Sequence, residues 1–221
     1  MNPDPAVIVL YDYWRSSAAY RVRIALNLKG LEYDQVPVNL VRDGGEQNTR
    51  AYRNINPQGL VPALVHNGRV ITQSLAACEY LDEVFPVPAL LPPGPEQRAR
   101  VRSMSLIVAC DIHPIDNLRV LFYLRDALGQ EEEARNLWYR HWVAKGLEAL
   151  EAALAGSDAT GTFCHGDTPG LADICLVPQI FNAKRFDCPL DGYPTVMRIF
   201  DTCMAHPAFD AAQPAKQPDA E

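Results

Sequence analysis

Apolar and polar positions follow two different patterns along the chain, and the change falls near residue 90. In the first part, runs with strand-like composition are separated by stretches with helical periodicity. Asn67-Gly68 stands in a predicted hairpin turn of the kind that prefers these two residues. The order β-α-β-α-β-β-α predicts a small sheet with helices packed on it. The predicted elements are strands at residues 8–11, 33–38, 62–66 and 69–71, and helices at residues 16–29, at 46–54 and from 73 onward.

Proline interrupts this pattern, and the second part of the chain is predicted to be helical. Residues 86–94 hold four prolines and one glycine, which cannot continue a helix. Pro114 is expected to bend or end the first long helix, and the tail from Ala211 is expected to fray. Apolar stripes define two helices, at Val101, Met104, Ser105, Val108 and Ile112 and at Tyr139, Trp142, Val143, Leu147, Leu150 and Leu154, and two more are predicted at residues 171–186 and 195–205.

We expect an α+β protein with a first domain at residues 1–87, a proline-rich linker at residues 88–94 and an all-helical domain at residues 95–221. Of its 221 residues 48% are apolar, which is enough for a buried core. No apolar stretch approaches the roughly 18 residues of a membrane span, and the start does not resemble a secretion signal. A net charge of −7 disfavours nucleic acid as a partner. We therefore expect a cytoplasmic protein that binds neither membranes nor nucleic acid.

The six cysteines are predicted to form neither disulfides nor a metal site. No two are closer than 11 positions, so the chain has no C-x-x-C motif and no finger-type zinc site. Cys110 and Cys175 lie among apolar residues and are interpreted as small core residues in a reducing compartment.

Ser16 and Ser17 stand where a predicted strand gives way to a predicted helix. The first N–H groups of a helix lack partners, and the helix dipole favours negative charge there. A serine at this position caps the helix, which is the commoner role, or helps to hold an anion such as a thiolate. Both roles are open at this point.

Two further positions point to ligand binding, and each has an ordinary explanation as well. A cis bond at Val61-Pro62 turns the Val61 N–H and C=O outward to pair with an extended peptide, whereas a strand-initial proline at a sheet edge needs no ligand. Gln73-Ser74 opens a helix and can hold a carboxylate, or serves as a plain N-cap. The Ser16-Ser17, Val61-Pro62 and Gln73-Ser74 motifs are each weak evidence of a ligand site alone, but their order and spacing together are strong evidence of one.

These motifs resemble the zeta class of the glutathione transferase superfamily, which includes the maleylacetoacetate and maleylpyruvate isomerases. The resemblance spans residues 8–209 and implies a thioredoxin-like first domain, an all-helical second domain and a homodimer. The motifs that carry it are Ser16-Ser17-x-x-x-Arg21-Val22-Arg23-Ile24-Ala25-Leu26, Asn56-Pro57 with Val61-Pro62, Gln73-Ser74, Asp111-Ile112-His113-Pro114, Asn117-Leu118-Arg119, and Leu176-Val177-Pro178-Gln179 through Arg185-Phe186.

The resemblance also implies roles for individual residues in binding the cofactor glutathione. Ser16 stabilises the thiolate, the Val61 backbone pairs with the cysteinyl part, and Gln47 reaches the glycyl end. Gln73 and Ser74 hold the γ-glutamyl end. Three residues of the second domain are implied to complete the site, namely His113, Asn117 and Arg119.

Some residues in or near these motifs are not expected to take part in the chemistry. Ala18 stands where the class has cysteine, which removes a thiol without removing the sulfur that bound glutathione supplies. Gly170 replaces the Ser or Thr of a helix capping box, and Asp173, interpreted as structural, can still bond back to the cap backbone. Arg21 and Arg23 are expected to hold structure through ion pairs or helix–sheet contacts.

The implied chemistry needs a nucleophile that adds to a cis double bond, permits rotation and then leaves. A free thiol has a pKa of about 8.5, which a hydroxyl hydrogen bond and a helix N-terminus can lower. Ser16, Ser17 and Arg15 are the predicted catalytic residues. The substrate is expected to be a small dicarboxylate, which Arg15, Arg119 and Arg185 can bind. Arg119 and Arg185 lie on predicted helices and would otherwise be interpreted as surface residues.

We therefore expect a glutathione-dependent cis–trans isomerase that converts a maleyl keto acid, maleylacetoacetate first, to its fumaryl isomer in aromatic amino acid or aromatic compound catabolism. Two nearby possibilities are a maleylpyruvate isomerase of the gentisate pathway and a general transferase that conjugates electrophiles. A non-catalytic transferase-like module that binds a protein partner is the possibility from another class.

Overall fold

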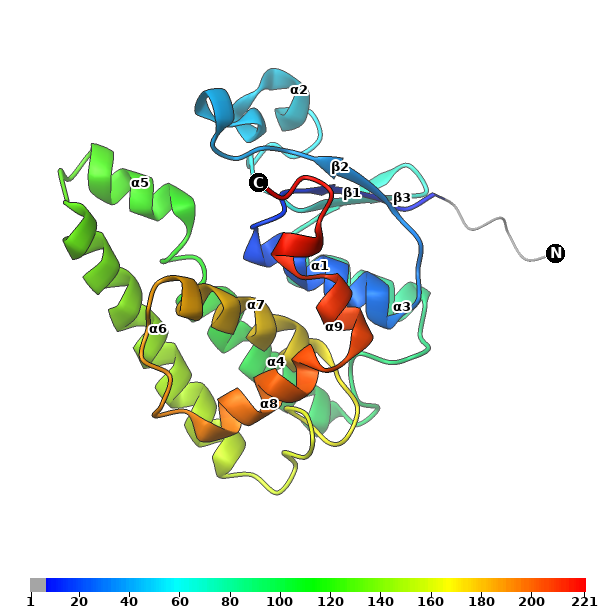
Figure 1. The fold of residues 1–221 in the computed structure, drawn as a ribbon. Helices are drawn as coiled ribbons and strands as arrows, with labels where there is room; N and C mark the ends of the chain where they lie inside the picture. The colour runs from blue at the N-terminus through cyan, green and yellow to red at the C-terminus, as the bar shows by residue number, and fades with distance from the viewer. Residues whose placement is uncertain (1–6) are drawn as a thin grey trace. The chain divides into compact units, whose positions relative to one another are not determined.

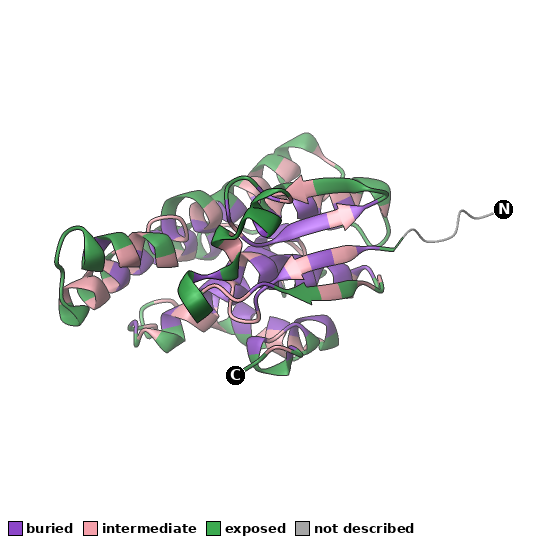
Figure 2. Cartoon of the chain, turned by 90° about the horizontal axis from the view of Figure 1, so that it is seen from above, coloured by how far each residue is buried: buried purple, intermediate pink, exposed green. Residues whose placement is uncertain are grey.

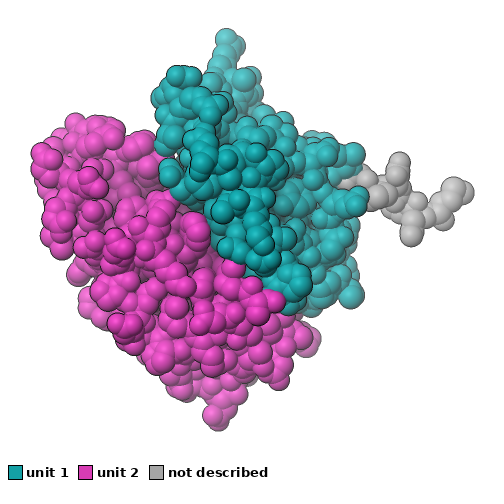
Figure 3. Space-filling model, in the orientation of Figure 1, with its two compact units in different colours: residues 1–90, 206–221 teal, residues 91–205 magenta. Residues whose placement is uncertain are grey.

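The computed structural model describes residues 7–221 and separates by packing into two compact units. Unit 1 holds the chain up to residue 90 together with residues 206–221, and unit 2 holds residues 91–205 (Figure 3). Each unit is described by itself below.

Unit 1 is built on a four-stranded sheet in the order β2-β1-β3-β4. β1 is parallel to β2, while the β1–β3 and β3–β4 pairs are antiparallel. Helices α1 and α3 pack side by side on one face of this sheet (Figure 1). The elements are β1 (Val9–Asp12), α1 (Ser17–Leu28), β2 (Asp34–Pro37), the 3-10 turns η1 (Arg42–Gly44) and η2 (Glu46–Asn48), α2 (Arg50–Arg53), β3 (Ala63–His66), β4 (Arg69–Thr72), α3 (Ser74–Val84), α9 (Pro207–Ala211) and the 3-10 turn η4 (Pro214–Lys216).

The predicted alternation of strands and helices is confirmed in unit 1, with one difference. Asn67 and Gly68 both have positive φ, 52° and 70°, as a two-residue hairpin turn between β3 and β4 requires. The single helix expected at residues 46–54 is instead η2 followed by the one-turn helix α2. The break falls at Thr49, whose hydroxyl caps α2 by accepting from Tyr52 N at 3.2 Å.

The core of unit 1 lies between the sheet and its helices. The α1 residues Val22, Ile24, Ala25 and Leu26 are each 0% exposed, which follows from the apolar spacing that predicts the helix. Figure 2 shows buried positions along the strands, whereas most connecting turns are exposed.

Residues 206–221 pack on unit 1, which differs from the expected division of the chain. The sequence assigns them to the helical domain at residues 95–221 and predicts that the tail from Ala211 frays. Instead, Arg23 Nε donates to Ala212 O at 3.1 Å and Asn27 Nδ2 donates to Ala208 O at 3.0 Å. Ala212 is 1% exposed. The prediction of fraying is wrong because these contacts join residues far apart in the sequence.

The segment after α3 is fixed to unit 1 through one buried amine. Lys29 Nζ lies 2.9 Å from Asp82 Oδ1, 2.7 Å from Phe85 O and 2.8 Å from Pro88 O. Asp82 in turn accepts from Leu90 N at 2.7 Å. The proline-rich segment is therefore bound along its first half, as far as residue 90.

Unit 2 is helical throughout the residues that form regular structure in it, as its apolar stripes predict. Pro114 follows the end of the first long helix, as expected, and α5 is the helix predicted to carry Arg119, although no apolar stripe defines its bounds. Gly146 on α6 allows η3 to approach, since a Cβ there would lie 2.2 Å from Ile112 Cδ1. The elements are α4 (Pro95–Leu106), the π-helical segment η3 (Ile107–Ile112), α5 (Leu118–Asp126), α6 (Glu132–Ala155), α7 (Leu171–Arg185) and α8 (Pro194–Met204).

The six cysteines are all free thiols. Cys175 is 0% exposed, as expected of a core residue. The same expectation for Cys110 is wrong, because this residue lies in η3 with its side chain exposed. Among the described residues, no helix is long and apolar enough to cross a membrane, and no group of acidic, His and Cys side chains is arranged to hold a metal ion.

Candidate functional site

Ser16 occupies the N-cap of α1, at the turn that follows β1. Its backbone is extended, with φ −70° and ψ 120°, and its hydroxyl oxygen accepts from Ala19 N at 3.2 Å. The predicted capping role is therefore confirmed. A hydroxyl that accepts one hydrogen bond still carries its own proton, so Ser16 can cap the helix and donate to an anion at the same time. Ser17 follows as the first helical residue and is buried.

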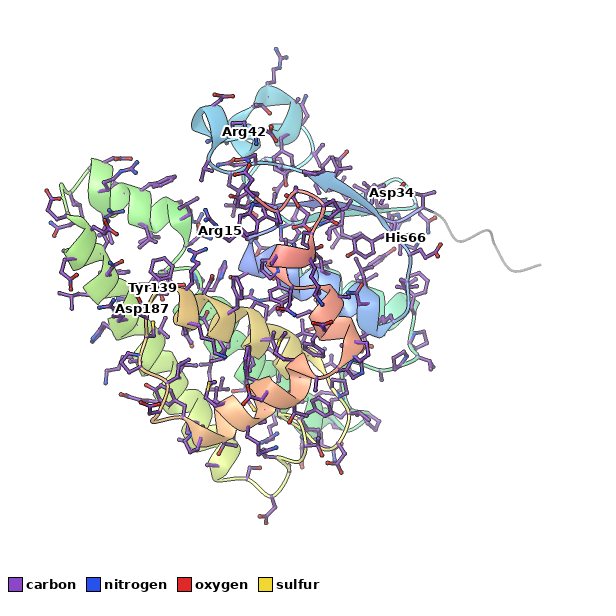
Figure 4. All side chains as sticks on the ribbon, viewed as in Figure 1. Arg15, Asp34, Arg42, His66, Tyr139 and Asp187 are labelled. Carbon is purple, nitrogen blue, oxygen red and sulfur yellow. The ribbon has the colours of Figure 1, made fainter. Side chains whose placement is uncertain are left out.

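Arg15 lies at the start of α1, where Figure 4 labels it. Its guanidinium carbon is 5.3 Å from the Trp14 ring and 6.0 Å from the Tyr13 ring. Tyr13 is 4% exposed and packs with Val38, Tyr52 and Val61. The aromatic residues thus support Arg15, and Tyr13 is a packing residue.

The Val61-Pro62 peptide bond is cis. Asn56 organises the loop before it, because its side chain donates to Leu60 O at 2.7 Å and accepts from Gln58 N at 3.1 Å. Within residues 7–221, no hydrogen bond engages the N–H or the C=O of Val61. This main-chain pair can therefore bond to an extended peptide in the manner of an added strand.

Gln73-Ser74 forms the start of α3, as predicted, but the Gln73 side chain does not cap the helix. The N-cap residue Gln73 has φ 70°, a conformation that favours glycine, and its side chain bonds to Gln58 Oε1 at 2.9 Å instead of capping the helix. Ser74 is 6% exposed and accepts from Arg21 Nη1 at 3.2 Å. The start of α3 therefore keeps N–H groups available to an anion.

Strand register brings these three features to one edge of the sheet. Tyr11 pairs with Ala63, and Ala63 pairs with Thr72. The turn to Ser16 follows the end of β1, the Val61-Pro62 bond precedes β3, and Gln73-Ser74 follows the end of β4. Because the three strand ends are neighbours, the helix start, the open main chain and the second helix start meet there.

Gln47 lies in η2, with its side chain turned toward the preceding loop. Nε2 donates to Leu40 O at 3.2 Å, while Oε1 is buried without a hydrogen-bond partner among the described residues. Gln47 Oε1 can therefore accept a hydrogen bond from an N–H group of a ligand.

In unit 2, the side chain of Asn117 brings three predicted residues together. Asn117 is the N-cap of α5, and its Oδ1 accepts from Arg119 N at 3.1 Å. Its Nδ2 lies 3.4 Å from His113 Nε2. His113, Asn117 and Arg119 thus form one local group, in which the Arg119 side chain is exposed.

Arg185 lies at the end of α7, with its guanidinium carbon 4.8 Å from the Phe186 ring. Phe186 stacks on Tyr139 of α6 at a centroid distance of 3.7 Å. In Figure 4, Tyr139 and Asp187 are labelled close together at this place. The stacking fixes the backbone from which Arg185 projects.

Asp116 is a residue of this region that sequence reasoning missed. It is 6% exposed, and neither carboxylate oxygen has a hydrogen-bond partner among the described residues. Burial raises the pKa of Asp116 to about 8. Asp116 also raises the pKa of Cys188, which burial and this carboxyl together bring to about 11. No local pattern in the sequence marks a carboxyl group as buried.

The remaining predictions for the helical part concern Asp173. Its Oδ2 accepts from Gly170 N at 2.9 Å and its Oδ1 accepts from Cys164 N at 2.9 Å. Asp173 is 1% exposed. The expected bond back to the cap backbone is confirmed, and glycine at the cap leaves the other half of the capping box unmade because it has no side chain.

Comparison with known families and structures agrees with this arrangement. Residues 15–84 match the N-terminal domain of glutathione S-transferases, and residues 132–202 match the C-terminal domain. Maleylacetoacetate isomerase of Pseudomonas aeruginosa is 51% identical over 211 residues, which cover 95% of this chain and 97% of the relative.

Two solved structures extend the similarity to the whole fold. One is the holo structure of maleylpyruvate isomerase, a bacterial zeta-class glutathione S-transferase, with 46% identity, a TM-score of 0.94 and coverage of 96% of this chain and 100% of that one. The other is maleylacetoacetate isomerase of Methylobacterium extorquens AM1 with bound malonate and glutathione, with 42% identity, a TM-score of 0.92 and coverage of 96% and 99%. The thioredoxin-like first domain and the helical second domain are thereby established. The chain belongs to the glutathione S-transferase family, in the zeta-class branch of the maleylacetoacetate and maleylpyruvate isomerases.

Proposed function

We propose that this protein is a glutathione-dependent cis–trans isomerase of a maleyl keto acid, with maleylacetoacetate as its first substrate. The observation that carries the proposal is the register of the sheet. It aligns the Ser16 helix start, the Val61 main chain without internal partners and the open start of α3 at one edge.

The residues at this edge fit the tripeptide glutathione. The Val61 N–H and C=O can pair with its cysteinyl part, as one strand pairs with another. The start of α3, with Gln73 and Ser74, can hold the γ-glutamyl carboxylate, and Gln47 has an unmatched acceptor for the glycyl end. Among the described residues, the Val61 N–H and C=O and the Gln47 Oε1 have no hydrogen-bond partner that would compete with the ligand.

When bound, glutathione supplies a sulfur that adds reversibly to the cis double bond of the substrate. The Ser16 hydroxyl donates to this sulfur, and the first turn of α1 adds a favourable dipole, so that the anionic form is stabilised. Ser17 continues the same turn from a buried position. Ala18 contributes no thiol of its own, so the chemistry rests on the cofactor.

Arginine side chains are the proposed contacts for the two carboxylates of the substrate. Arg15, beside Ser16, is held by aromatic rings and forms no hydrogen bond with residues 7–221. Arg119 and Arg185 in unit 2 are exposed and can each bind a carboxylate in two-point fashion. His113 and Asn117 are proposed to support Arg119 and to complete the binding of glutathione.

The relatives support the isomerase assignment, and two of them bear on the choice of substrate. The 51% identity is to a maleylacetoacetate isomerase, whereas the TM-score of 0.94 is to a maleylpyruvate isomerase. Maleylpyruvate is therefore a specific second candidate for the substrate. A general conjugating transferase and a non-catalytic binding module are less well supported, because neither needs arginines such as Arg15, Arg119 and Arg185 to bind the two carboxylates of a substrate.

The decisive experiment follows loss of the cis substrate with and without glutathione. We expect turnover that requires glutathione, with maleylacetoacetate converted faster than maleylpyruvate. Turnover that is unaffected by removing glutathione contradicts the proposal. Faster conversion of maleylpyruvate favours the maleylpyruvate isomerase, and faster conjugation of a neutral aryl halide favours the transferase. Failure to be retained on glutathione resin favours the binding module.

The proposal extends to the roles of the two units, the oligomeric state, the location of the protein and its place in metabolism. Unit 1 acts as the glutathione-binding domain, and unit 2, residues 91–205, acts as the substrate-binding domain. The protein is a homodimer, which size-exclusion chromatography with light scattering tests. It works in the cytoplasm, and its place is in the breakdown of aromatic compounds.

A further inference from the structure

Arg21 and Arg23 lie two positions apart on α1 and are both buried, but they differ in the groups that contact their guanidinium charges. Arg23 pairs with the carboxylate of Asp12. Arg21 is 2% exposed, and its Nη1 donates to the neutral hydroxyl of Ser74 at 3.2 Å. Its Nε and Nη2 are buried and have no hydrogen-bond partner among the described residues. α1 therefore holds one neutralised guanidinium and one without a carboxylate partner.

A buried charge without a counter-ion is energetically unfavourable. A lysine or histidine can lose its proton and become neutral, but an arginine stays protonated and keeps its charge. Such a side chain makes its surroundings electropositive. The same surroundings include the start of α3, where the helix dipole adds positive character and where the first turn holds no acidic residue. Both features favour an anion next to Ser74.

The hydrogen bond from Arg21 also fixes the role of the Ser74 hydroxyl. A serine hydroxyl has one proton to donate and two lone pairs to accept with. Because one lone pair of Ser74 is occupied by Arg21 Nη1, its proton is directed elsewhere. Ser74 is the first residue of α3, so no preceding turn of that helix supplies a carbonyl to receive this proton.

We propose that Arg21 is a positioning residue for the γ-glutamyl carboxylate of glutathione, orienting the Ser74 hydroxyl to donate to that carboxylate and placing a fixed positive charge behind it. The inference rests on the proposed function, which assigns the Gln73-Ser74 helix start to this end of the tripeptide. The carboxylate then takes the place of the counter-ion that Arg21 lacks within residues 7–221. This role differs from the ion pair or helix–sheet contact that the sequence predicted for Arg21.

The test compares two ligands that differ in this one carboxylate. Glutathione and γ-aminobutyryl-cysteinylglycine, the same tripeptide without the α-carboxylate of its first residue, are titrated calorimetrically into wild type, Arg21→Gln, Arg21→Lys and Ser74→Ala. We expect Arg21→Gln to weaken glutathione binding at least tenfold and to leave binding of the analogue within twofold. Arg21→Lys keeps the charge and is expected to retain part of the affinity.

The double variant and the kinetics separate positioning from a merely structural role. Because Arg21 acts through Ser74, the double variant is expected to bind glutathione no more weakly than the weaker single variant. The KM for glutathione is expected to rise by the same factor as the dissociation constant, with a much smaller fall in kcat. Additive losses in the double variant overturn the inference.

Stability provides a check that the variants are folded. Removing a buried guanidinium without a counter-ion is expected to leave the melting temperature of Arg21→Gln unchanged or higher. If this variant does not fold, Ser74→Ala carries the test, with the same selective loss of glutathione binding expected. Equal losses for both ligands overturn the inference. A wild type that binds both ligands equally overturns it while leaving the proposed function intact, whereas a wild type that binds neither overturns the proposed function itself.

Discussion

Arg23 and Asp12 form an ion pair in which both side chains are 0% exposed, with Nη1 2.7 Å from Oδ2. Asp12 ends β1 and Arg23 lies in the middle of α1. Arg23 also donates from Nη2 to Trp14 O at 2.9 Å, so one guanidinium ties the strand end, the turn toward Ser16 and the helix together. The position of the Ser16 hydroxyl therefore depends on a charge pair in the core.

Asp12→Ala is expected to destabilise the protein strongly, because it leaves the Arg23 charge buried without its partner. The free energy of unfolding, measured by urea denaturation, is expected to fall by about 3–5 kcal/mol. Glu148→Ala is the matched control, since it breaks an exposed ion pair with Lys145, whose Nζ lies 3.2 Å from Glu148 Oε2. A similar loss of stability in both variants contradicts the importance of the buried pair.

Ser16→Ala is expected to slow isomerisation about tenfold or more, since it removes a hydrogen bond to a charged sulfur. It is also expected to lower the free energy of unfolding by about 1 kcal/mol through loss of the N-cap. Thr49→Ala is the control, because it removes the comparable cap of α2 at a distance of 3.2 Å from Tyr52 N. Steady-state rates and denaturation of both variants separate the two effects. A wild-type rate in Ser16→Ala leaves this serine with a capping role alone.

Asp116 is expected to make stability fall as pH rises. Its pKa is raised to about 8 in the folded protein by burial, so the folded state keeps a proton that the unfolded chain loses at its ordinary pKa of 3.8. The contribution of Asp116 to the free energy of unfolding is therefore fully present below about pH 4. It is lost as the pH rises toward 8, and the free energy of unfolding falls by up to roughly 5 kcal/mol. Tyr139 and Cys188 face this carboxyl, and neither offers a positive charge.

Asp116→Asn checks this expectation through the difference from wild type. The variant is expected to gain stability relative to wild type as pH is raised from 4 to 8, measured by denaturation at each pH. Asp111→Asn is the control, because it changes an exposed carboxylate on η3, five positions before Asp116. A difference from wild type that does not vary with pH contradicts the assignment.

Asn117 is expected to have two separable effects. Asn117→Ala removes the N-cap of α5 and the contact with His113, so the free energy of unfolding is expected to fall by about 1 kcal/mol. Asn117→Asp keeps the capping oxygen and replaces the amide, so stability is expected to be retained while the KM for glutathione rises. Denaturation measures the free energy of unfolding, and steady-state kinetics measure the KM for glutathione. Equal stability losses in the two variants contradict the division of roles.

Much of the fold follows from local patterns in the sequence. The apolar spacing of α1, the Asn67-Gly68 turn and the capping position of Ser16 are each set by residues close together in the chain, so they could be predicted. Periodicity does not indicate which part of glutathione each residue is expected to bind, and this information comes from the family resemblance.

The remaining features depend on contacts between distant parts of the chain. Arg21 meets Ser74 across 53 positions, and Arg23 meets Ala212 across 189 positions, so neither partner could be predicted from spacing. Asp116 is buried and interacts electrostatically with Tyr139 and Cys188, which are distant in the sequence, so its neighbours in the chain do not indicate its burial. Local reasoning therefore identified the starts of α1 and α3, and missed the distant partners of Arg21 and Arg23 and the burial of Asp116.

The packing of residues 206–221 on unit 1 has a consequence for synthesis of the protein. Unit 2 is an insertion between two separated pieces of unit 1. During translation, all of unit 2 is synthesised before the carbonyl of Ala212 exists to receive Arg23. The β-containing unit can therefore close around its buried arginine only at the end of synthesis, after every residue of the helical unit has been added to the chain.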